Sequence, residues 1–405
     1  MWKETEIGRI PNDWQINKIG EIADVTKLAG YEYTKHFTYV EDGEVIALRA
    51  LNVREGVLDL TDVKRIYQSV SDNLIRSKLF KGDILFTYVG ANIGQFALVD
   101  ANDKYHLAPN ICRIRAKKNC LPFFLFSYFR TKYFKENLNN YSVGSSQPTM
   151  PMGNVRQIKV PIPPLIEQVA IADVLSSLDD KIDLLHRQNK TLEQLAETLF
   201  KQWFVEEANE NWEVGKLSDF AKNIQYGFTQ SASWENIGPR FLRITDIQGG
   251  NVNWEVVPFC ASSETEFSKY ELKTGDVVIA RTGASTGENL YIYKPEKAIF
   301  ASYLIRIQFS KLAFARYAAM HMRSSDYFRY IEGILSGSAQ PNANANELSS
   351  FEISLPPEEK LNSFFKIVTE LDEKKHFNQT QIHTLAQLRD MLLPKLMSGE
   401  VRVEN

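Results

Sequence analysis

Gly82-Asp-Ile-Leu-Phe-Thr-Tyr-Val-Gly-Ala-Asn-Ile-Gly94 returns 193 residues later as Gly275-Asp-Val-Val-Ile-Ala-Arg-Thr-Gly-Ala-Ser-Thr-Gly287. The same offset relates four further pairs of motifs: Arg113-Ile114 and Arg306-Ile307, Gly144-Ser-Ser-Gln-Pro148 and Gly337-Ser-Ala-Gln-Pro341, Pro163-Pro164 and Pro356-Pro357, Leu178-Asp179 and Leu371-Asp372. One structural unit is therefore encoded twice. Two copies of one surface suit a target that also comes in two parts.

Composition sets the broad class of the protein. A chain of 405 residues with 44% hydrophobic content is long enough for two or more domains. Three cysteines without a CxxC pair argue against a disulfide framework. The first residues are charged, and no apolar stretch reaches the roughly 18 residues of a membrane span. We therefore expect a soluble cytoplasmic protein that makes no membrane contact.

Charge is distributed unevenly along the chain, although the formal net charge is only −3. Residues 1–164 carry 22 Lys and Arg against 17 Asp and Glu, whereas residues 165–211 carry 4 against 10. A basic first segment is compatible with nucleic-acid binding, but an excess of five charges is also compatible with an ordinary solvated surface. Charge alone does not identify a partner.

The first part of each repeat mixes strands with helices. Runs rich in β-branched and aromatic residues, bounded by Gly and Asp, predict strands at 45–53, 84–89 and 110–115, and again at 241–247, 277–281 and 303–308. Aromatic-rich helical stretches follow at 123–141 and 314–335. Each repeat therefore begins with an α/β domain.

The second part of each repeat predicts a long helix. Residues 166–204 contain no Gly or Pro, and their apolar residues follow a heptad pattern that is typical of a coiled coil. The downstream copy is the weaker one, because Lys375, Asn378 and Arg389 interrupt its seam. The seam positions are Leu175, Leu178, Ile182, Leu185, Asn189, Leu192 and Leu199 in the first copy, and Leu371, Ile382, Leu385 and Leu392 in the second.

These patterns predict a pseudo-twofold α/β protein with two target domains and two antiparallel coiled-coil helices. The predicted boundaries are 1–164 for the first domain, 165–208 for the central helix, 209–357 for the second domain, and 358–405 for the C-terminal helix and tail. A helix that simply packs on its own domain is the alternative for each long segment. If the two halves close on each other, the segment from Leu396 should end near Ile7-Gly-Arg-Ile-Pro11.

The ordered set of motifs resembles the type I restriction-modification specificity subunits. The resemblance rests on the opening Ile7-Gly-Arg-Ile-Pro-Asn-Asp-Trp14, the paired Gly-Asp strands, the Gly-x-x-x-Gly loops, the Ser-x-Gln-Pro turns and the Pro-Pro entries into Leu-Asp-containing helices. It covers essentially the whole chain, in the order domain, spacer helix, domain, spacer helix. Each motif alone is a common turn, and the duplicated order is what is specific.

The resemblance implies a non-catalytic subunit that reads a bipartite sequence in double-stranded DNA. It further implies two methylation subunits that modify adenines and two motor-nuclease subunits that carry out restriction. S-adenosylmethionine, ATP and Mg²⁺ would then be held by those partners, and this chain would hold no cofactor and no metal. The slightly acidic second domain and the interrupted second seam depart from the family pattern.

Motifs for catalysis are missing from the sequence, in agreement with a non-catalytic role. The chain has no Asn-Pro-Pro-aromatic motif, no GxxxxGK[ST] phosphate loop, no HExxH and no Cys/His cluster at zinc spacing. The loops at 90–94 and 283–287 lack the Lys-Ser/Thr of a phosphate loop and stand between two strands. We therefore interpret them as hairpin turns.

Candidate DNA-reading residues are polar side chains at matching positions of the two repeats. Arg reads guanine, and Asn or Gln reads adenine, from elements that reach the major groove. Residues shared by both copies could equally brace the fold or contact phosphate, whereas residues that differ imply different half-sites. The candidates are Arg49, Asn52, Tyr88, Asn92, Gln147 and Thr149 in the first copy, and Arg243, Asp246, Arg281, Thr282, Ser285, Gln340, Asn342 and Asn344 in the second.

A duplicated protein–protein scaffold without DNA contact is the competing function. Duplication and a coiled-coil strut fit it equally well. Steep loss of oligonucleotide binding with rising salt separates the two, because counterion release accompanies phosphate contact.

Overall fold

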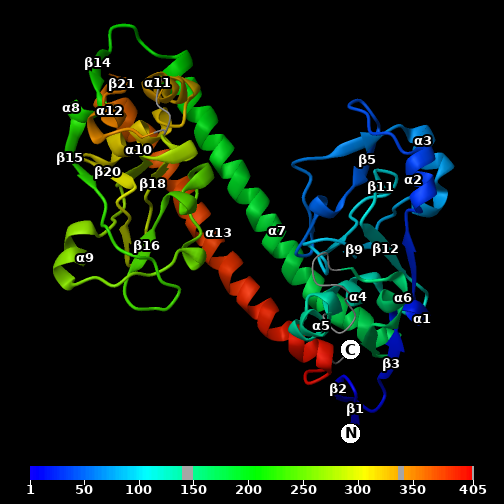
Figure 1. Ribbon diagram of the computed structural model, residues 1–405. Coiled ribbons are helices and arrows are strands. Elements are labelled where there is room, and N and C mark those ends of the chain that lie inside the picture. The colour runs from blue at the N-terminus through cyan, green and yellow to red at the C-terminus, as the bar shows by residue number, and fades with distance from the viewer. Residues whose placement is uncertain (139–148, 336–341, 404–405) are drawn as a thin grey trace. The chain divides into compact units, whose positions relative to one another are not determined.

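The computed structural model describes residues 1–138, 149–335 and 342–403 and divides the chain into two compact units. Unit 1 contains residues 1–184 and 381–405, and unit 2 contains residues 185–380. Each unit therefore combines one α/β domain with a stretch of each of the two long helices, α7 (Leu165–Lys201) and α13 (Glu358–Ser398) (Figure 1).

Unit 1 is built on a four-stranded antiparallel sheet with strand order β10-β9-β12-β4. A three-stranded sheet, β11-β5-β8, and the pairs β13-β3, β1-β2 and β6-β7 complete its strands. The strands are β1 (Trp2–Thr5), β2 (Gly8–Pro11), β3 (Gln15–Lys18), β4 (Ala23–Lys27), β5 (Val45–Leu48), β6 (Val53–Arg54), β7 (Val57–Leu58), β8 (Lys64–Ile66), β9 (Ile84–Thr87), β10 (Phe96–Leu98), β11 (Tyr105–Leu107), β12 (Ile111–Ala116) and β13 (Lys159–Ile162). The shorter helices are α1 (Ile19–Ile22), α2 (Gly30–His36), α3 (Gln68–Asn73), α4 (Pro122–Phe129), α5 (Lys132–Asn137) and α6 (Met152–Gln157).

Unit 2 repeats this topology. Its four-stranded sheet has the order β18-β17-β20-β15, the parallel pair β16-β19 matches β5-β11, and β14-β21 matches β3-β13. The predicted internal repeat of α/β domains is therefore confirmed. The strands are β14 (Glu213–Lys216), β15 (Ala221–Tyr226), β16 (Arg240–Leu242), β17 (Val277–Ala280), β18 (Asn289–Tyr291), β19 (Ala298–Phe300), β20 (Leu304–Phe309) and β21 (Glu352–Leu355), and the helices are α8 (Leu217–Phe220), α9 (Glu264–Tyr270), α10 (Leu312–His321), α11 (Ser325–Leu335) and α12 (Ala345–Ser349).

Two predicted strands are shorter than the sequence suggested. The run at 45–53 forms a strand only to Leu48, and the run at 241–247 only to Leu242. In each case a side chain captures a backbone N–H and turns the chain: Asn52 accepts from Arg49 N, and Asp246 accepts from Arg243 N. Side-chain capture of a backbone donor ends the strand ladder at that residue.

The main core of each unit lies between its four-stranded sheet and the aromatic helices that follow it. In unit 1, strands β9, β10 and β12 pack against α4 and α5, where the Phe129 and Phe134 rings stack with centroids 4.3 Å apart. The same core takes in Leu175 of α7 and Leu396 of α13. In unit 2, Phe204, just after α7, and Phe364 of α13 belong to the corresponding core and pack edge to face against each other. The long helices are therefore part of both cores.

The two long helices run antiparallel within each unit. In unit 2, Asn378 is fully buried and its side-chain amide donates to Oδ1 of Asn189 at 2.9 Å, while Lys375 lies 3.8 Å from Glu193. In unit 1, Arg389 lies 3.1 Å from Asp179. Of the predicted seam residues, Leu175 and Leu185 are buried, and Leu178, Ile182, Asn189, Leu192, Leu199, Leu371, Ile382, Leu385 and Leu392 are half-buried.

The three polar residues that interrupt the seam of the second helix are each matched by a group on the first helix, and the expectation that this seam is the weaker of the two stays a prediction. Lys375, Asn378 and Arg389 each meet a polar or acidic group of α7. A buried polar group that has lost its partner is strongly destabilising, so these residues penalise any register in which their partners are absent. The three residues therefore specify the pairing.

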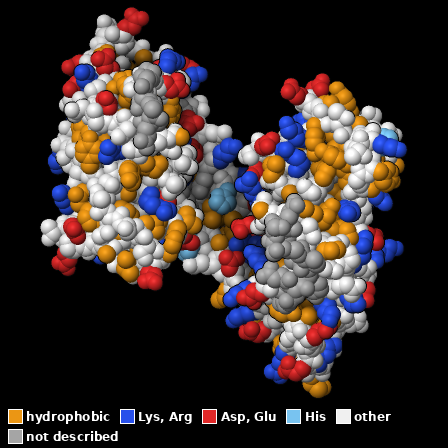
Figure 2. Space-filling model, viewed as in Figure 1, with side chains coloured by type: hydrophobic (Ala, Val, Ile, Leu, Met, Phe, Trp, Pro, Cys, Tyr) orange, Lys and Arg blue, Asp and Glu red, His pale blue; other side chains and the backbone are white. Residues whose placement is uncertain are grey.

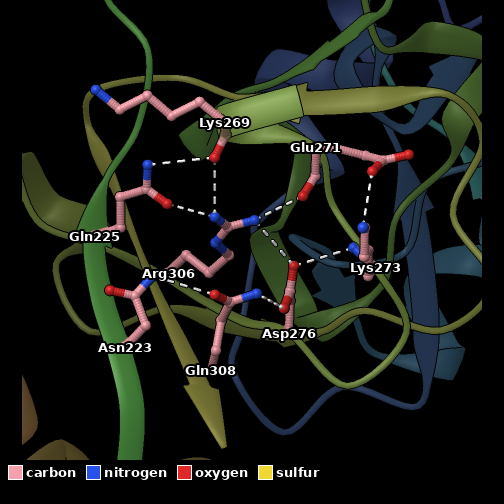
Figure 3. A network of polar contacts seen from close by, with 8 residues as sticks. All are labelled: Asn223, Gln225, Lys269, Glu271, Lys273, Asp276, Arg306 and Gln308. Atoms are coloured by element: carbon pink, nitrogen blue, oxygen red, sulfur yellow. Dashed lines mark hydrogen bonds and ion pairs between the residues drawn. The ribbon is translucent and has the colours of Figure 1, made fainter. Parts of the chain in front are cut away.

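The repeated Gly-Asp and Arg-Ile motifs brace the sheet (Figure 3). In unit 2, Asp276 accepts from Lys273 N at 3.0 Å and closes its own turn, and Arg306 lies 3.3 Å from the same carboxylate. Arg306 also donates to the carbonyls of residues 269 and 271, as Arg113 does to the carbonyls of residues 76 and 78. The repeat therefore preserves these residues as supports of the fold.

In each unit, an arginine of the domain binds the Asp of the repeated Leu-Asp motif and fastens the domain to a long helix, although the two arginines are not equivalent by the repeat. Arg130 follows α4 and binds Asp179 of α7 at 2.6 and 3.3 Å, and Arg316 of α10 binds Asp372 of α13 at 2.9 and 3.1 Å. Two parallel donors on one carboxylate fix orientation as well as distance. The helix that packs on its own domain, which the sequence left as an alternative, therefore coexists with helix–helix pairing.

The chain ends lie together in unit 1, as predicted (Figure 1). Arg402 binds Asp13 at 2.7 Å and Glu167 at 2.6 Å, and Glu167 accepts from the Trp14 indole at 3.0 Å. The hydrogen bond from Arg402 lowers the pKa of the Asp13 carboxyl. The tail that follows α13 is thus tied to the start of the first domain.

Candidate nucleic-acid interface

The Gly-x-x-x-Gly loop and the segment after the Ser-x-Gln-Pro motif meet in both units. In unit 1, Val89 forms an antiparallel bridge with Thr149. In unit 2, Thr282 forms the matching bridge with Asn342, and Ala343 N donates to the Arg281 carbonyl at 2.9 Å. Two segments that are about 60 residues apart in sequence therefore build one loop surface on each domain.

The Gly-x-x-x-Gly segments are hairpin turns, as the sequence predicted. The first connects the antiparallel strands β9 and β10, and the second connects β17 and β18. The glycines have positive φ, and the last one in each loop also sits against a helix side chain. A Cβ on Gly94 would lie 2.7 Å from Leu138, and one on Gly287 would lie 2.8 Å from Ile331. The turns are pinned to α5 and α11 by these close approaches.

A cation–aromatic pair lies beside the loop surface in each unit. The strand end that supplies the cation in one unit supplies the tyrosine in the other. In unit 1, Lys27 at the end of β4 lies 5.4 Å from the ring of Tyr88. In unit 2, Arg281 lies 5.0 Å from the ring of Tyr226 at the end of β15. Tyr88 and Arg281 are equivalent by the repeat, and Lys27 and Tyr226 pair with the equivalent residues Cys112 and Ile305. The cation therefore comes from a different strand in each unit.

The surroundings of the pair hold it beside the loops. Burial raises the pKa of the Tyr88 hydroxyl, so Tyr88 stays neutral and Lys27 is the exposed charged member. In unit 2, the Tyr226 hydroxyl accepts from Ala345 N at 3.0 Å, and Arg281 reaches the Ser302 carbonyl at 3.4 Å and Asn342 Oδ1 at 3.5 Å. Such long hydrogen bonds are weak, so the Arg281 guanidinium retains donors for another partner.

Four of the predicted reader side chains are used within their own turns. Asn52 is fully buried and donates to the carbonyls of Asp59 and Asp62, and Arg49 also binds Asp62. Arg243 and Asp246 bind each other at 2.9 and 3.0 Å. These contacts make them supports of the loop after β5 or β16. Asn52 is removed from solvent in this structure, and a reader role for it, as for the other three, stays a prediction.

The remaining candidates lie on the loop surface or next to it. Asn92 and Asn342 are exposed, Thr149 and Thr282 are half-buried, and Ser285 accepts from Gln248 at 3.2 Å. Asn344 is exposed and caps the N-terminus of α12 by accepting from Glu347 N. Gln147 and Gln340 lie outside the described residues. A reader role for these residues stays a prediction.

Lys27 and Tyr226 join the site although the sequence did not single them out. Each follows a strand that pairs with the central strand β12 or β20, and this pairing brings them to Tyr88 and Arg281. Their spacing drifts from the offset of 193, so the repeat did not align them. Antiparallel register, which is a tertiary property, is the missing signal.

Charge on the surface is mixed. On the face that Figure 2 shows, Lys and Arg side chains are interspersed with Asp and Glu in each unit. Within the described residues, no group of three or more His, Cys, Asp or Glu side chains could hold a metal ion. None of the described helices is long and apolar enough to cross a membrane.

Comparison with known proteins identifies the family. The type I restriction modification DNA specificity domain matches twice, over residues 11–194 and 209–387. The MjaIX specificity subunit of a type I restriction enzyme from Methanocaldococcus jannaschii is 28% identical over all of this chain and 97% of its own length. The EcoKI specificity subunit from Escherichia coli is 22% identical, over 98% of this chain and 91% of its own length.

The fold is also similar to that of a solved relative. The S subunit of a type I restriction-modification system from M. genitalium superposes with a TM-score of 0.60 at 16% identity, covering 96% of both chains. The chain belongs to the type I restriction modification DNA specificity family. It is a specificity subunit, and it determines DNA target specificity within a restriction-modification complex.

Proposed function

We propose that each unit reads one half of a bipartite DNA target through its own loop surface. The observation that carries this proposal is the duplicated bridge, Val89 with Thr149 and Thr282 with Asn342, which offers one backbone frame with different side chains. A shared frame supports a common docking geometry, and differing side chains support different base sequences.

The cation–aromatic pairs suggest how the two half-sites differ. Lys27 offers a single ammonium from β4, whereas Arg281 offers a planar guanidinium from the end of β17. A guanidinium can donate two parallel hydrogen bonds to guanine, and an ammonium acts as a point donor. We therefore expect the base that Lys27 contacts in one half-site and the base that Arg281 contacts in the other to lie at different positions.

The remaining functions belong to partner subunits in this proposal. Two methylation subunits would modify an adenine in each half-site, using S-adenosylmethionine, and two motor-nuclease subunits would use ATP and Mg²⁺. The chain itself would be the non-catalytic scaffold of that adenine-N6 methyltransferase and endonuclease complex. Target specificity within a restriction-modification complex is the coarser function that supports this proposal.

Exchange of one domain tests the reading model. Residues 15–160 would be replaced by the equivalent segment of a relative, and methylated motifs would be mapped in cells that carry the complete system. One half-site should change while the other half-site and the length of the gap stay constant. A simultaneous change in both half-sites, or a single contiguous motif, would refute independent reading.

Salt dependence tests DNA contact against the protein scaffold alternative. Oligonucleotide binding by the assembled complex should fall linearly on a log–log plot with salt, with a slope that scales with the number of phosphate contacts. A slope near zero, with partner assembly intact, would favour the scaffold.

A further inference from the structure

Seven ion pairs among the described residues join the two halves of the chain, and these seven follow one sign rule. We call residues 1–208 the N half and residues 209–405 the C half. The N half supplies the acid and the C half the base in seven ion pairs: Asp13–Arg402, Glu167–Arg402, Asp179–Arg389, Glu193–Lys375, Glu193–Arg323, Glu197–Arg323 and Glu207–Lys360, at 2.6 to 3.8 Å. These pairs occur in both units.

The rule is most informative at equivalent ends of the long helices. In unit 1, Arg402 after α13 binds Glu167 at the start of α7. In unit 2, Glu207 after α7 binds Lys360 at the start of α13. Glu167 and Lys360 are equivalent by the repeat, yet they carry opposite charge. The start of each long helix thus makes an ion pair with the segment after the other long helix, and the sign of its charge is reversed between the two units.

A pair of two N halves would lose five of the seven contacts. The two contacts that Arg323 makes with Glu193 and Glu197 would be kept, because Arg323 corresponds to Arg130 by the offset of 193. By the offset of 193, Glu207 would face Glu167 in place of Lys360. Glu193 would face Ile182 in place of Lys375, and Asp179 would face Ala196 in place of Arg389. Like charges repel, and a half-buried carboxylate opposite an apolar side chain loses one compensating charge. Asp179 would keep only its contact with Arg130 of the same N half. Single surface pairs contribute little, but several reversed contacts discriminate between partners.

We propose that the acidic side of the N half is an interaction surface that accepts a C half of this chain and rejects a second N half. A reader built from two N halves would display the same loop surface twice and would recognise an inverted repeat. Exclusion of that pair keeps the target asymmetric. This consequence rests on the proposed function, whereas the pairing rule itself does not.

Cleavage of the folded full-length protein provides the test. A protease site would replace the exposed residues 208–211 between Glu207 and Trp212. Two preparations whose N halves carry different tags would be cleaved, mixed and equilibrated, and one tag would be captured. The captured N half should bring down an equal amount of C half and none of the other N half. Capture of the second N half in an amount comparable to the C half would overturn the proposal.

Charge reversal gives a second, independent measurement. Glu193→Lys with Glu207→Lys should weaken the cleaved pair by about tenfold or more, because each new lysine faces a C-half cation. Adding Lys360→Glu and Lys375→Glu should restore it, because Arg323 keeps its pair with Glu197, and this recovery also shows that the reversed chain folds. Unchanged affinity after charge reversal, or no recovery of affinity with the compensating substitutions, would refute the sign rule.

A matched control separates the sign rule from a general effect of net charge. Lys311 binds Glu358 at 2.7 Å within the C half. Lys311→Glu reverses a charge of the same size without touching an inter-half contact, and it should leave the affinity of the cleaved pair unchanged. Because no DNA is present, the result stands apart from the proposed reading of half-sites.

Discussion

Replacement of Arg281 by alanine is the most direct test of the loop surface. In the folded protein this side chain makes a cation–π contact at 5.0 Å with Tyr226 and two long hydrogen bonds at 3.4 and 3.5 Å. Their combined contribution to stability is about 1 kcal/mol, compared with roughly 5–15 kcal/mol for a typical domain. Arg281→Ala should therefore fold normally.

The effect on DNA should be larger and confined to one base. A well-placed contact from arginine to a base contributes about 1–3 kcal/mol of discrimination, which is about five- to a hundredfold in affinity. Arg281→Ala should lose this factor against the cognate target and should relax specificity at one position of the half-site that unit 2 reads. Discrimination in the other half-site should not change.

The assay is competition binding by the complex assembled with its partner subunits. A panel of oligonucleotides, each with one base pair of one half-site changed, would be compared for the native protein and the variant. Arg329→Ala is the matched control, since Arg329 is a 73% exposed arginine of unit 2 that pairs only with the nearby Asp326 among the described contacts. Uniform weakening on all oligonucleotides would mean phosphate contact, and an unchanged affinity would remove Arg281 from the interface.

Three further outcomes are expected. Gly287→Ala should lower the free energy of unfolding in urea by roughly 2–4 kcal/mol, since φ at Gly287 is +93° and a Cβ would lie 2.8 Å from Ile331. Gly283→Ala, where a Cβ would have no atom within 4 Å, should lower it by only about 1 kcal/mol. Equal losses for the two variants would contradict the steric argument. Burial lowers the pKa of His321 to about 4, below an unfolded value of 6.5, so up to about 3 kcal/mol of stability is present above pH 6.5 and is lost as pH falls toward 4; His321→Phe should flatten this part of the pH profile, and an unchanged profile would exclude the histidine. A circular permutant that joins the natural ends and opens near Asn209 should fold, assemble and bind DNA, because the ends already meet in unit 1; a folded permutant without assembly would count against closure of the two halves.

The sequence by itself determined the architecture. The repeat at one offset, the strands around Gly82-Asp83 and Gly275-Asp276, and the helices after each Pro-Pro follow from local patterns of Gly, Pro and apolar residues. Such patterns act over a few residues or over one helical period, so they can be interpreted without knowing what lies opposite. The family followed from the order of these elements.

Only the tertiary structure decided which polar residues face one another. Asn52 looked like a reader and is buried within its own turn, while Lys27 and Tyr226 looked unremarkable in sequence and flank the loop surface. In the sequence, three polar residues interrupt the apolar seam of the second long helix, and in the structure each meets a polar or acidic group of the first long helix: Lys375, Asn378 and Arg389. The physical reason is that a polar side chain is stabilised by its partner, and a partner across a sheet or a helix pair is set by register between segments that are far apart in the chain.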